Sequence, residues 1–192
     1  MVADSAAMPL TGSGRVQSVS PGCALLLPGD NLPAWVFVNL RTDHAGEVGA
    51  VCIYQGVLQF ARNPALRAFA EHHLVTEQKH LCLISAWLPS SRHSRLLSLW
   101  RLAGFLTGAL PALFGPKAVY ATIEAVETFV DLHYEEQVRA LASQPALSDL
   151  RQTLLDCQAD EVAHRNAAPV NQVGCCAPGA PWWALAQALR WH

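Results

Sequence analysis

The chain has 192 residues, a length that suffices for one domain with a sizeable core. Its 13 basic and 15 acidic side chains give a formal net charge of −2, and this balance argues against a nucleic-acid-binding protein. Hydrophobic residues make up 52% of the chain and charged residues 15%, which excludes an intrinsically disordered protein. The mean hydropathy of +0.20 is high for a soluble protein and indicates contact with lipid or with an apolar ligand.

The first 34 residues are rich in Gly, Pro and Ser and lack hydrophobic periodicity. We therefore expect a mobile N-terminal segment at 1–34 and one folded domain at 35–192. No basic region followed by an apolar run occurs in this segment, so we expect no signal peptide. The six cysteines form no Cys-x-x-Cys pair, which favours free thiols in a reducing cytosol.

From about residue 34 onward the apolar residues follow a helical period, and no segment alternates as a β-strand would. Proline marks three expected helix starts, at Pro64, Pro116 and Pro145. The pattern predicts four main helices at about 35–62, 64–88, 116–143 and 145–167. A crossover joins the second of these helices to the third, and a short C-terminal segment follows the fourth.

The crossover contains an apolar stretch at 96–114, whose single charge is Arg101 and which carries Pro111 near its end. Its length approaches that of a membrane span, but the charge and the proline argue against spanning. Three interpretations remain open. The stretch is an interfacial or channel-lining helix, a buried core helix, or a true span, and the first fits best.

Steps of three and four residues along each main helix place one carboxylate on its apolar face. Two helices add a histidine three residues after the glutamate. An isolated buried carboxylate costs several kcal/mol, whereas two divalent cations would balance four carboxylates. Four carboxylates and two imidazoles are a ligand set suited to iron or manganese. The predicted metal ligands are Glu47, Glu77, His80, Glu127, Glu161 and His164.

These residues form an internal repeat. A separation of 30 residues joins Glu47 to Glu77, and one of 34 residues joins Glu127 to Glu161. Each half is therefore a helical hairpin that offers Glu and then Glu-x-x-His. Two such halves joined by a crossover predict an all-α fold, a ferritin-like four-helix bundle with a crossover helix and a short C-terminal segment.

Other polar residues near these positions have more than one interpretation. Asp160 is placed either for a hydrogen bond to a ligand histidine or as a plain surface acid. His72 and His73 are expected to be solvated or to line a channel rather than to bind metal. Tyr54, on the apolar face of the first helix, is expected to pack in the core.

The segment LRTDHAGEVGAVCIYQG resembles the first helix of the demethoxyubiquinone hydroxylases, the di-iron enzymes of ubiquinone biosynthesis, which carries a D-H-A-G-E-x-G-A motif. The resemblance covers about residues 28–180 and rests on the order and spacing of five motifs. It continues through Glu77-Gln-Lys-His80, the apolar LWRLAGFLTGAL crossover, Ala125-Val126-Glu127, His133-Tyr134 and Asp160-Glu161-x-x-His164.

The resemblance implies two iron ions per chain at the six residues named above, with His133 and Tyr134 as the family's His-Tyr pair near the metal. It also implies the reaction, which adds one oxygen atom of O₂ to the ring of a polyprenyl methoxy-benzoquinol. The expected location is the cytoplasmic face of a bacterial inner membrane, as a peripheral membrane protein. Contact with other ubiquinone-biosynthesis proteins is a further expectation.

Two other functions compete with this hypothesis. One is a ferritin-like iron or peroxide-handling protein without an organic substrate, and the other is an inactive quinone-binding paralogue. The apolar crossover favours the hydroxylase, since a storage protein has no use for a lipid-like entry. No Arg or Lys lies on the four ligand faces, so an uncharged ring fits the site better than an anionic substrate.

Overall fold

The computed structural model describes residues 32–167, so nearly all of the expected mobile segment 1–34 and the whole C-terminal segment lie outside the described residues. Within this part the chain is helical and contains no strand, as predicted. The elements are α1 (Ala34–Phe60), α2 (Pro64–Trp87), η1 (Ser90–Arg92), α3 (Leu97–Phe114), α4 (Pro116–Leu141), η2 (Pro145–Leu147) and α5 (Ser148–Ala167).

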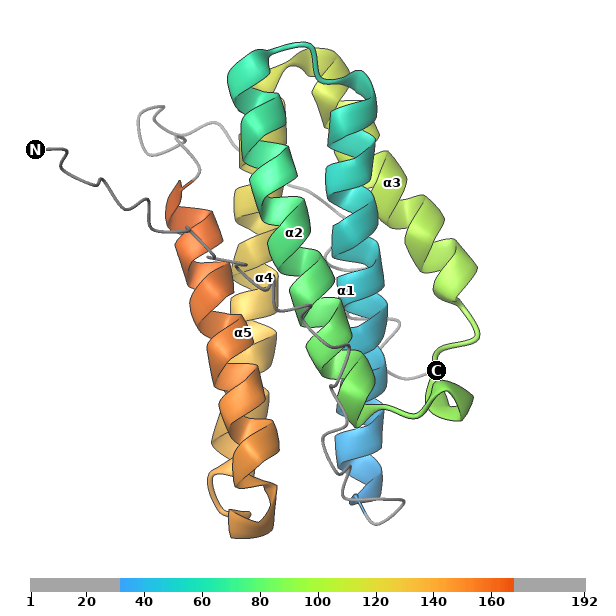
Figure 1. The fold of residues 1–192 in the computed structure, drawn as a ribbon, viewed down its shortest axis with the longest axis vertical. Coiled ribbons are helices and arrows are strands. Elements are labelled where there is room, and N and C mark those ends of the chain that lie inside the picture. The colour runs from blue at the N-terminus through green and yellow to red at the C-terminus, as the bar shows by residue number, and fades with distance from the viewer. Residues whose placement is uncertain (1–31, 168–192) are drawn as a thin grey trace, which may run out of the picture.

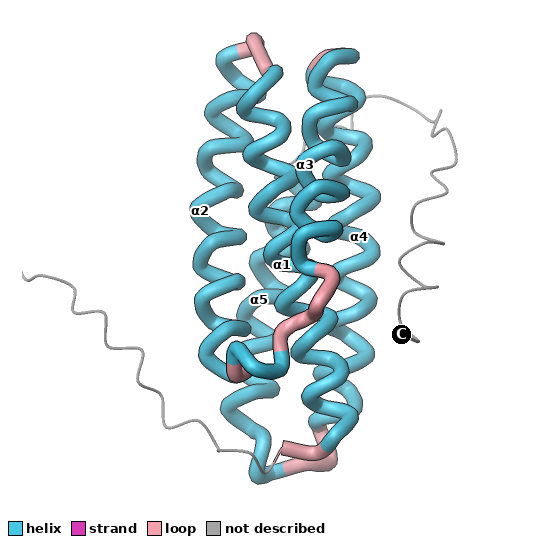
Figure 2. Tube along the Cα trace, turned by 90° about the vertical axis from the view of Figure 1, so that its right-hand side faces the viewer, coloured by secondary structure: helices cyan, strands magenta, loops and turns pink. Residues whose placement is uncertain are grey.

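Four long helices, α1, α2, α4 and α5, run side by side along the long axis of the molecule (Figures 1 and 2). The hairpin of α1 and α2 faces the hairpin of α4 and α5, and α3 connects the two along the outside of α1. The predicted all-α, ferritin-like bundle with a crossover helix is confirmed.

Two of the three predicted proline starts are correct. Pro64 opens α2, where the Asn63 side chain accepts a hydrogen bond of 3.0 Å from the Leu66 N–H. Pro116 opens α4 directly after Gly115, whose φ of 100° is a conformation that favours glycine. Pro145 instead begins the tight turn η2, and α5 starts three residues later than predicted, because bonds between residues three apart close this turn first.

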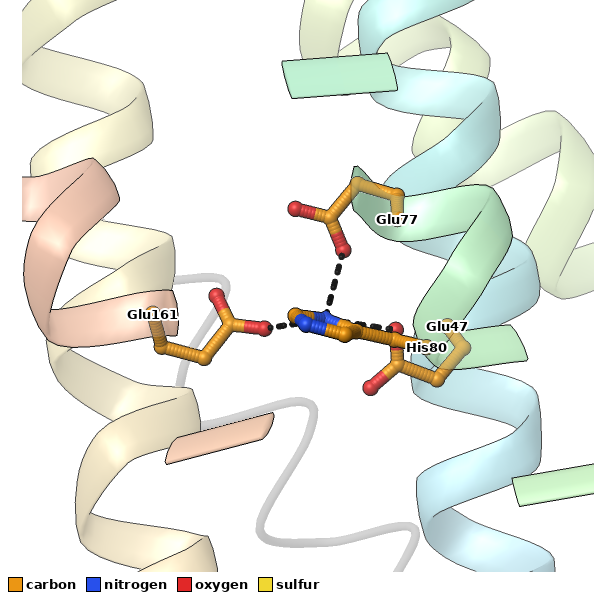
Figure 3. Close-up of side chains that lie close together, drawn as sticks. All are labelled: Glu47, Glu77, His80 and Glu161. Atoms are coloured by element: carbon orange, nitrogen blue, oxygen red, sulfur yellow. Dashed lines mark ion pairs between the residues drawn. The ribbon is translucent and has the colours of Figure 1, made fainter. Parts of the chain in front are cut away.

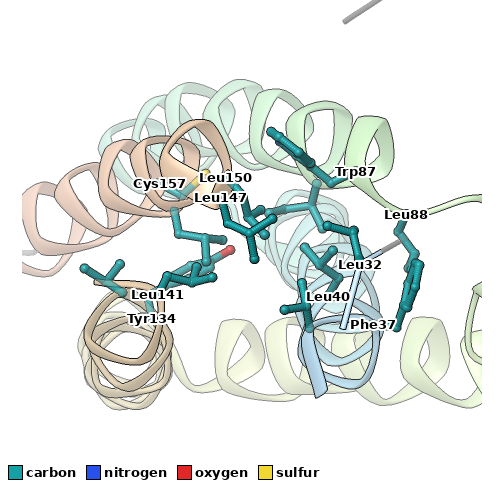
Figure 4. Close-up of a cluster of buried hydrophobic side chains, with 14 residues drawn as sticks. Leu32, Phe37, Leu40, Trp87, Leu88, Tyr134, Leu141, Leu147, Leu150 and Cys157 are labelled. Atoms are coloured by element: carbon teal, nitrogen blue, oxygen red, sulfur yellow. The ribbon is translucent and has the colours of Figure 1, made fainter. Parts of the chain in front are cut away.

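The apolar core consists of two clusters. One joins Leu40 of α1 to residues of α2, α4 and α5, including Ile84, Leu141 and Leu154 (Figure 4). The other surrounds Val57 further along α1. The buried carboxylates of the bundle lie between these two clusters in the order of residues along α1. This arrangement surrounds a polar centre with packed hydrocarbon at both ends.

Glycines bring α3 into close contact with α1. A Cβ atom on Gly104 would collide with the backbone of Gly49, and one on Gly108 would collide with the backbone of Ile53. Gly56 on α1 approaches the backbone of Phe105 in the same way. Because α3 contacts α1 through small residues, its large side chains point elsewhere.

The outer face of α3 is apolar and exposed. Within the described residues, α3 is the one helix long and apolar enough to cross a membrane. Of its residues Leu97–Phe114, 22% are buried. A core helix would be mostly buried, so the interpretation of the 96–114 stretch as a buried core helix was wrong. The exposed large side chains are Leu96, Leu99, Leu102, Leu106, Leu110, Leu113 and Phe114.

We expect Gly108→Ala to lower the free energy of unfolding by about 1–3 kcal/mol, because the added methyl group meets the α1 backbone. Gly46→Ala is the matched control. Nothing lies within 4 Å of a Cβ atom at Gly46, so a helical alanine there should add about 0.5–1 kcal/mol of stability. Urea unfolding followed by circular dichroism measures both variants. Equal effects of the two substitutions would contradict the close α1–α3 packing.

Candidate metal centre

The structure brings all six predicted ligand residues together in the interior of the bundle. Each of the four long helices contributes at least one of them, and every residue in the set is at most 4% exposed. The residues are Glu47 of α1, Glu77 and His80 of α2, Glu127 of α4, and Glu161 and His164 of α5.

The six side chains form two overlapping groups, and each group could hold a metal ion. Within each group the candidate ligand atoms all lie within 4.8 Å of one another. Glu77 and Glu161 belong to both groups, so each would be shared if both groups held an ion. Glu47 and His80 complete the group drawn in Figure 3, and the other group contains Glu127 and His164.

The Nδ1 atom of each histidine faces the carboxylates. His80 Nδ1 lies 3.0 Å from Glu161 Oε1 and 3.7 Å from Glu77 Oε2. His164 Nδ1 lies 3.3 Å from Glu77 Oε1 and 3.9 Å from Glu161 Oε2. The two histidines thus approach the same pair of glutamates through equivalent atoms.

The donor set fits divalent metal ions. Within the described part of the chain, several buried atoms of this centre lack a hydrogen-bond partner, and burial without one is costly. Carboxylate oxygens and imidazole nitrogens that converge on common points suit a first-row transition metal. The atoms are Glu47 Oε2, Glu77 Oε1, His80 Nδ1, Glu161 Oε2 and His164 Nδ1.

Burial determines the protonation of these groups. It raises the pKa of Glu47 and of Glu127 well above the usual range, and that of Glu161 to about 7. Burial opposes the ionised form of Glu77 as well, but the adjacent rings of His164 and His80 leave its pKa below its ordinary value. Protons and metal ions therefore compete for the same carboxylates.

Two tyrosines bond the outer glutamates, Glu47 and Glu127, each of which belongs to only one of the two groups. Tyr134 of α4 donates a hydrogen bond to Oε1 of Glu47 on α1, and Tyr54 of α1 donates one of 3.0 Å to Oε1 of Glu127 on α4. Tyr54 packs in the core, as expected, and its hydroxyl group also bonds Glu127, which was not expected. A signal was present, because each tyrosine follows the glutamate of its own helix by seven residues and the spacing is doubled.

His133 and Tyr134 occupy different places. Tyr134 reaches the carboxylates, whereas His133 Nε2 lies 3.0 Å from Asp43 Oδ1, one helical turn before Glu47. Gln137 Nε2 donates to the same oxygen of Asp43 at 2.7 Å. A cavity of about 470 Å³ between α1 and α4 is lined partly by His133 and Gln137, the two residues that contact Asp43.

Asp160 makes the hydrogen bond that its position allowed. Its Oδ2 lies 3.1 Å from Nε2 of His80, the ring nitrogen that points away from the carboxylates. Lys79 Nζ donates to the same oxygen at 3.0 Å. A carboxylate on the outer nitrogen of a metal-binding histidine fixes the ring and increases its basicity.

His73 is buried rather than solvated, and it belongs to neither of the two groups that could hold a metal ion. Its ring lies edge-on to His164, with 4.1 Å between the ring centroids, and also packs on Phe69. Burial, together with repulsion from His164, lowers the pKa of His73 to about 4, so the ring is neutral at physiological pH. His72 is exposed, as expected.

The sequence of the whole domain matches one protein family. The family model described as ubiquinone biosynthesis protein COQ7 matches residues 36–189, which include every residue of the centre. The chain belongs to the COQ7 family. The resemblance drawn from the sequence motifs is thereby confirmed.

Curated relatives of this COQ7-family chain come from bacteria and eukaryotes. The 3-demethoxyubiquinol 3-hydroxylase of Rhodospirillum rubrum is 38% identical over 76% of this chain and 69% of the relative. The NADPH-dependent 3-demethoxyubiquinone 3-hydroxylase, mitochondrial, of Dictyostelium discoideum is 35% identical over 65% and 59%. The 3-demethoxyubiquinol 3-hydroxylase of Ralstonia pickettii is 31% identical over 79% and 67%. The chain thus spans about three-fifths to two-thirds of the length of these relatives.

In protein stripped of metal by a chelator, we expect the free energy of unfolding to fall as the pH rises from about 6.5 to about 8.5. The raised pKa values of Glu47 and Glu127 mean that the folded chain still binds protons that the unfolded chain has released. His80 acts in the same direction, since the adjacent carboxylates of Glu161 and Glu77 outweigh burial and raise its pKa to about 11.

The lowered pKa values of His44 and His73 oppose this trend only below about pH 6.5, because above it both rings are neutral in both states. Urea unfolding at each pH, with and without added Mn²⁺, measures the effect. Metal should flatten the pH dependence, since it replaces the protons. An identical slope with and without metal would contradict the assignment of these carboxylates as ligands.

Proposed function

We propose that the chain is a 3-demethoxyubiquinol 3-hydroxylase, which uses O₂ to hydroxylate the ring of a polyprenyl methoxy-methyl-benzoquinol in ubiquinone biosynthesis. The observation that carries the proposal is the doubled Glu and Glu-x-x-His set, assembled in one buried centre within the matched domain. The names of the relatives from R. rubrum and R. pickettii supply the substrate and the reaction.

The proposed cofactor is a pair of iron ions per chain, held by the six glutamates and histidines of the centre. Four carboxylates balance the charge of two Fe(II) ions, so the loaded centre is close to neutral. Such a pair supplies two electrons to O₂. One oxygen atom enters the ring as a hydroxyl group, and the other leaves as water with two protons.

Residues next to the proposed ligands orient them and offer a path for protons. Tyr134 and Tyr54 each hold one oxygen of an outer glutamate, Glu47 and Glu127, which fixes the carboxylate orientation. We assign His133 and Tyr134 as the catalytic candidates. Tyr134 bonds the proposed metal ligand Glu47. His133 with Asp43 offers a route for protons between the cavity and the centre.

The proposed location is the surface of a membrane, because the substrate carries a prenyl tail. The outer face of α3 exposes a row of leucines, and an apolar patch of this kind is typical of a surface that contacts lipid or another protein. Arg101 and Pro111 within α3 favour a helix that lies in the interface rather than one that spans it. We propose the cytoplasmic face of a bacterial inner membrane, the location that the resemblance of the sequence motifs implies.

The reaction is tested by a single turnover. Protein is loaded anaerobically with Fe(II), mixed with a prenylated methoxy-benzoquinol and exposed to labelled O₂, and the products are analysed by mass spectrometry. We expect one labelled oxygen atom on the ring. Label found only in water, with the ring unchanged, would move the protein to the oxidase or peroxide-handling class.

Glu127→Ala should lose about one equivalent of iron and the hydroxylated product with it. Glu135→Ala is the matched control, since this glutamate is on the same helix but is exposed and paired with Arg139. It should keep its iron and its product. Iron analysis and product analysis are made on both variants, and equal iron in wild type and Glu127→Ala would contradict the ligand assignment.

Membrane association is tested with phosphatidylcholine vesicles. We expect Leu102→Ser on α3 to weaken binding by about tenfold, as burial of one leucine contributes about 1.5–3 kcal/mol. Leu132→Ser on α4 is a matched control, with a side chain that is 55% exposed against 56% for Leu102. It should leave binding unchanged. Equal losses would assign no special role to α3, and resistance to an alkaline carbonate wash would indicate a span.

A further inference from the structure

The two halves of the centre offer the same kinds of ligand. Each contains one histidine, one outer glutamate and the two shared glutamates, so the residues that touch the metal give neither half an advantage. A difference in affinity must then come from the residues behind the ligands. Glu47 corresponds to Glu127 in the two repeats, and Glu77 corresponds to Glu161. The residues that surround these ligands can therefore be compared pair by pair.

The outer nitrogen of His80 has a carboxylate partner. Asp160 accepts from it at 3.1 Å, and Lys79 shares the same oxygen at 3.0 Å. Asp160 directly precedes Glu161. The residue that directly precedes Glu77 in the other repeat is Thr76, which carries no charge.

The surroundings of His164 are different. Within residues 32–167, no ion pair joins its Nε2 atom to a carboxylate, although its Nδ1 atom faces three of them. The ring of His73 lies edge-on against it instead. His164 thus lacks the support that His80 receives.

The outer glutamates repeat this asymmetry. Behind Glu47 lies the polar cluster of Asp43, His133 and Gln137. The corresponding positions of the other repeat hold Ile123, Ile53 and Val57, all of which are buried in an apolar cluster. At these three compared pairs of positions, the polar member therefore lies behind Glu47 and the apolar member on the side of Glu127.

We infer that the half containing Glu47 and His80 binds its metal ion more tightly than the half containing Glu127 and His164, which is the exchangeable position. The inference rests on the proposed two-metal site and extends it. Loss of such an outer partner typically costs about 10- to 100-fold in metal affinity. The side chain of Asp160 is 36% exposed, so we expect about tenfold, the lower end of that range.

Equilibrium dialysis against buffered Fe(II) under anaerobic conditions tests this inference without reference to activity. Repulsion between two cations would separate two binding steps even in a symmetric site, so the comparison uses variants that keep one half. His164→Ala retains the supported half and should take up its first ion at the wild-type free Fe(II). His80→Ala retains the other half and should need about tenfold more.

Asp160→Asn and Thr76→Asp complete the test with changes outside the ligand set, where folding is checked by circular dichroism. Asp160→Asn should weaken the first binding step of otherwise unchanged protein, and Thr76→Asp should tighten the second. Equal first-ion affinities in His80→Ala and His164→Ala, or an equal effect of Asp160→Asn on both steps, would overturn the inference and leave the proposed function intact. Failure of the wild type to bind iron would overturn both.

Discussion

The constraint on which this structure depends is the burial of four carboxylates in the middle of a helical bundle. Glu47, Glu77, Glu127 and Glu161 are almost fully removed from water, and apolar clusters lie on either side of them. Such groups are stable as a set only when cations or protons offset their charge. That requirement explains why the histidines turn their Nδ1 atoms inward, and why the pKa values of three of the glutamates are raised.

The internal repeat explains how one chain builds such a centre. Each hairpin supplies half of the ligands, and Tyr54 and Tyr134 tie each half to the other by bonding the glutamate of the opposite hairpin. The tyrosines therefore couple the geometry of the two halves. The repeat is not exact behind the ligands, where Asp160 and Asp43 have no acidic counterparts. Two chemically similar candidate metal positions thus stand in different surroundings.

The crossover helix α3 follows a different rule from the rest of the fold. Its inner face is made of small residues, so it contacts α1 backbone to backbone and contributes little to the core. Its large side chains are consequently left on the outer surface. A helix attached in this way enlarges the apolar surface of the molecule without disturbing the bundle, as the proposed reaction on a prenylated quinol would require.

The sequence by itself determined the helices and the six residues of the centre, because a helical period and the spacing of Glu-x-x-His are local properties of the chain. It also determined the family, through the order of its motifs. Only the tertiary structure decided which side chains meet across helices. The bonds of Tyr54 to Glu127 and of Asp160 to His80, and the burial of His73 against His164, depend on which helices are neighbours and on their rotation. The exposure of α3 was likewise decided by the tertiary structure, because an apolar sequence is compatible with a core, a membrane or a surface. The glycines of α3 contact α1, so its large side chains remain exposed.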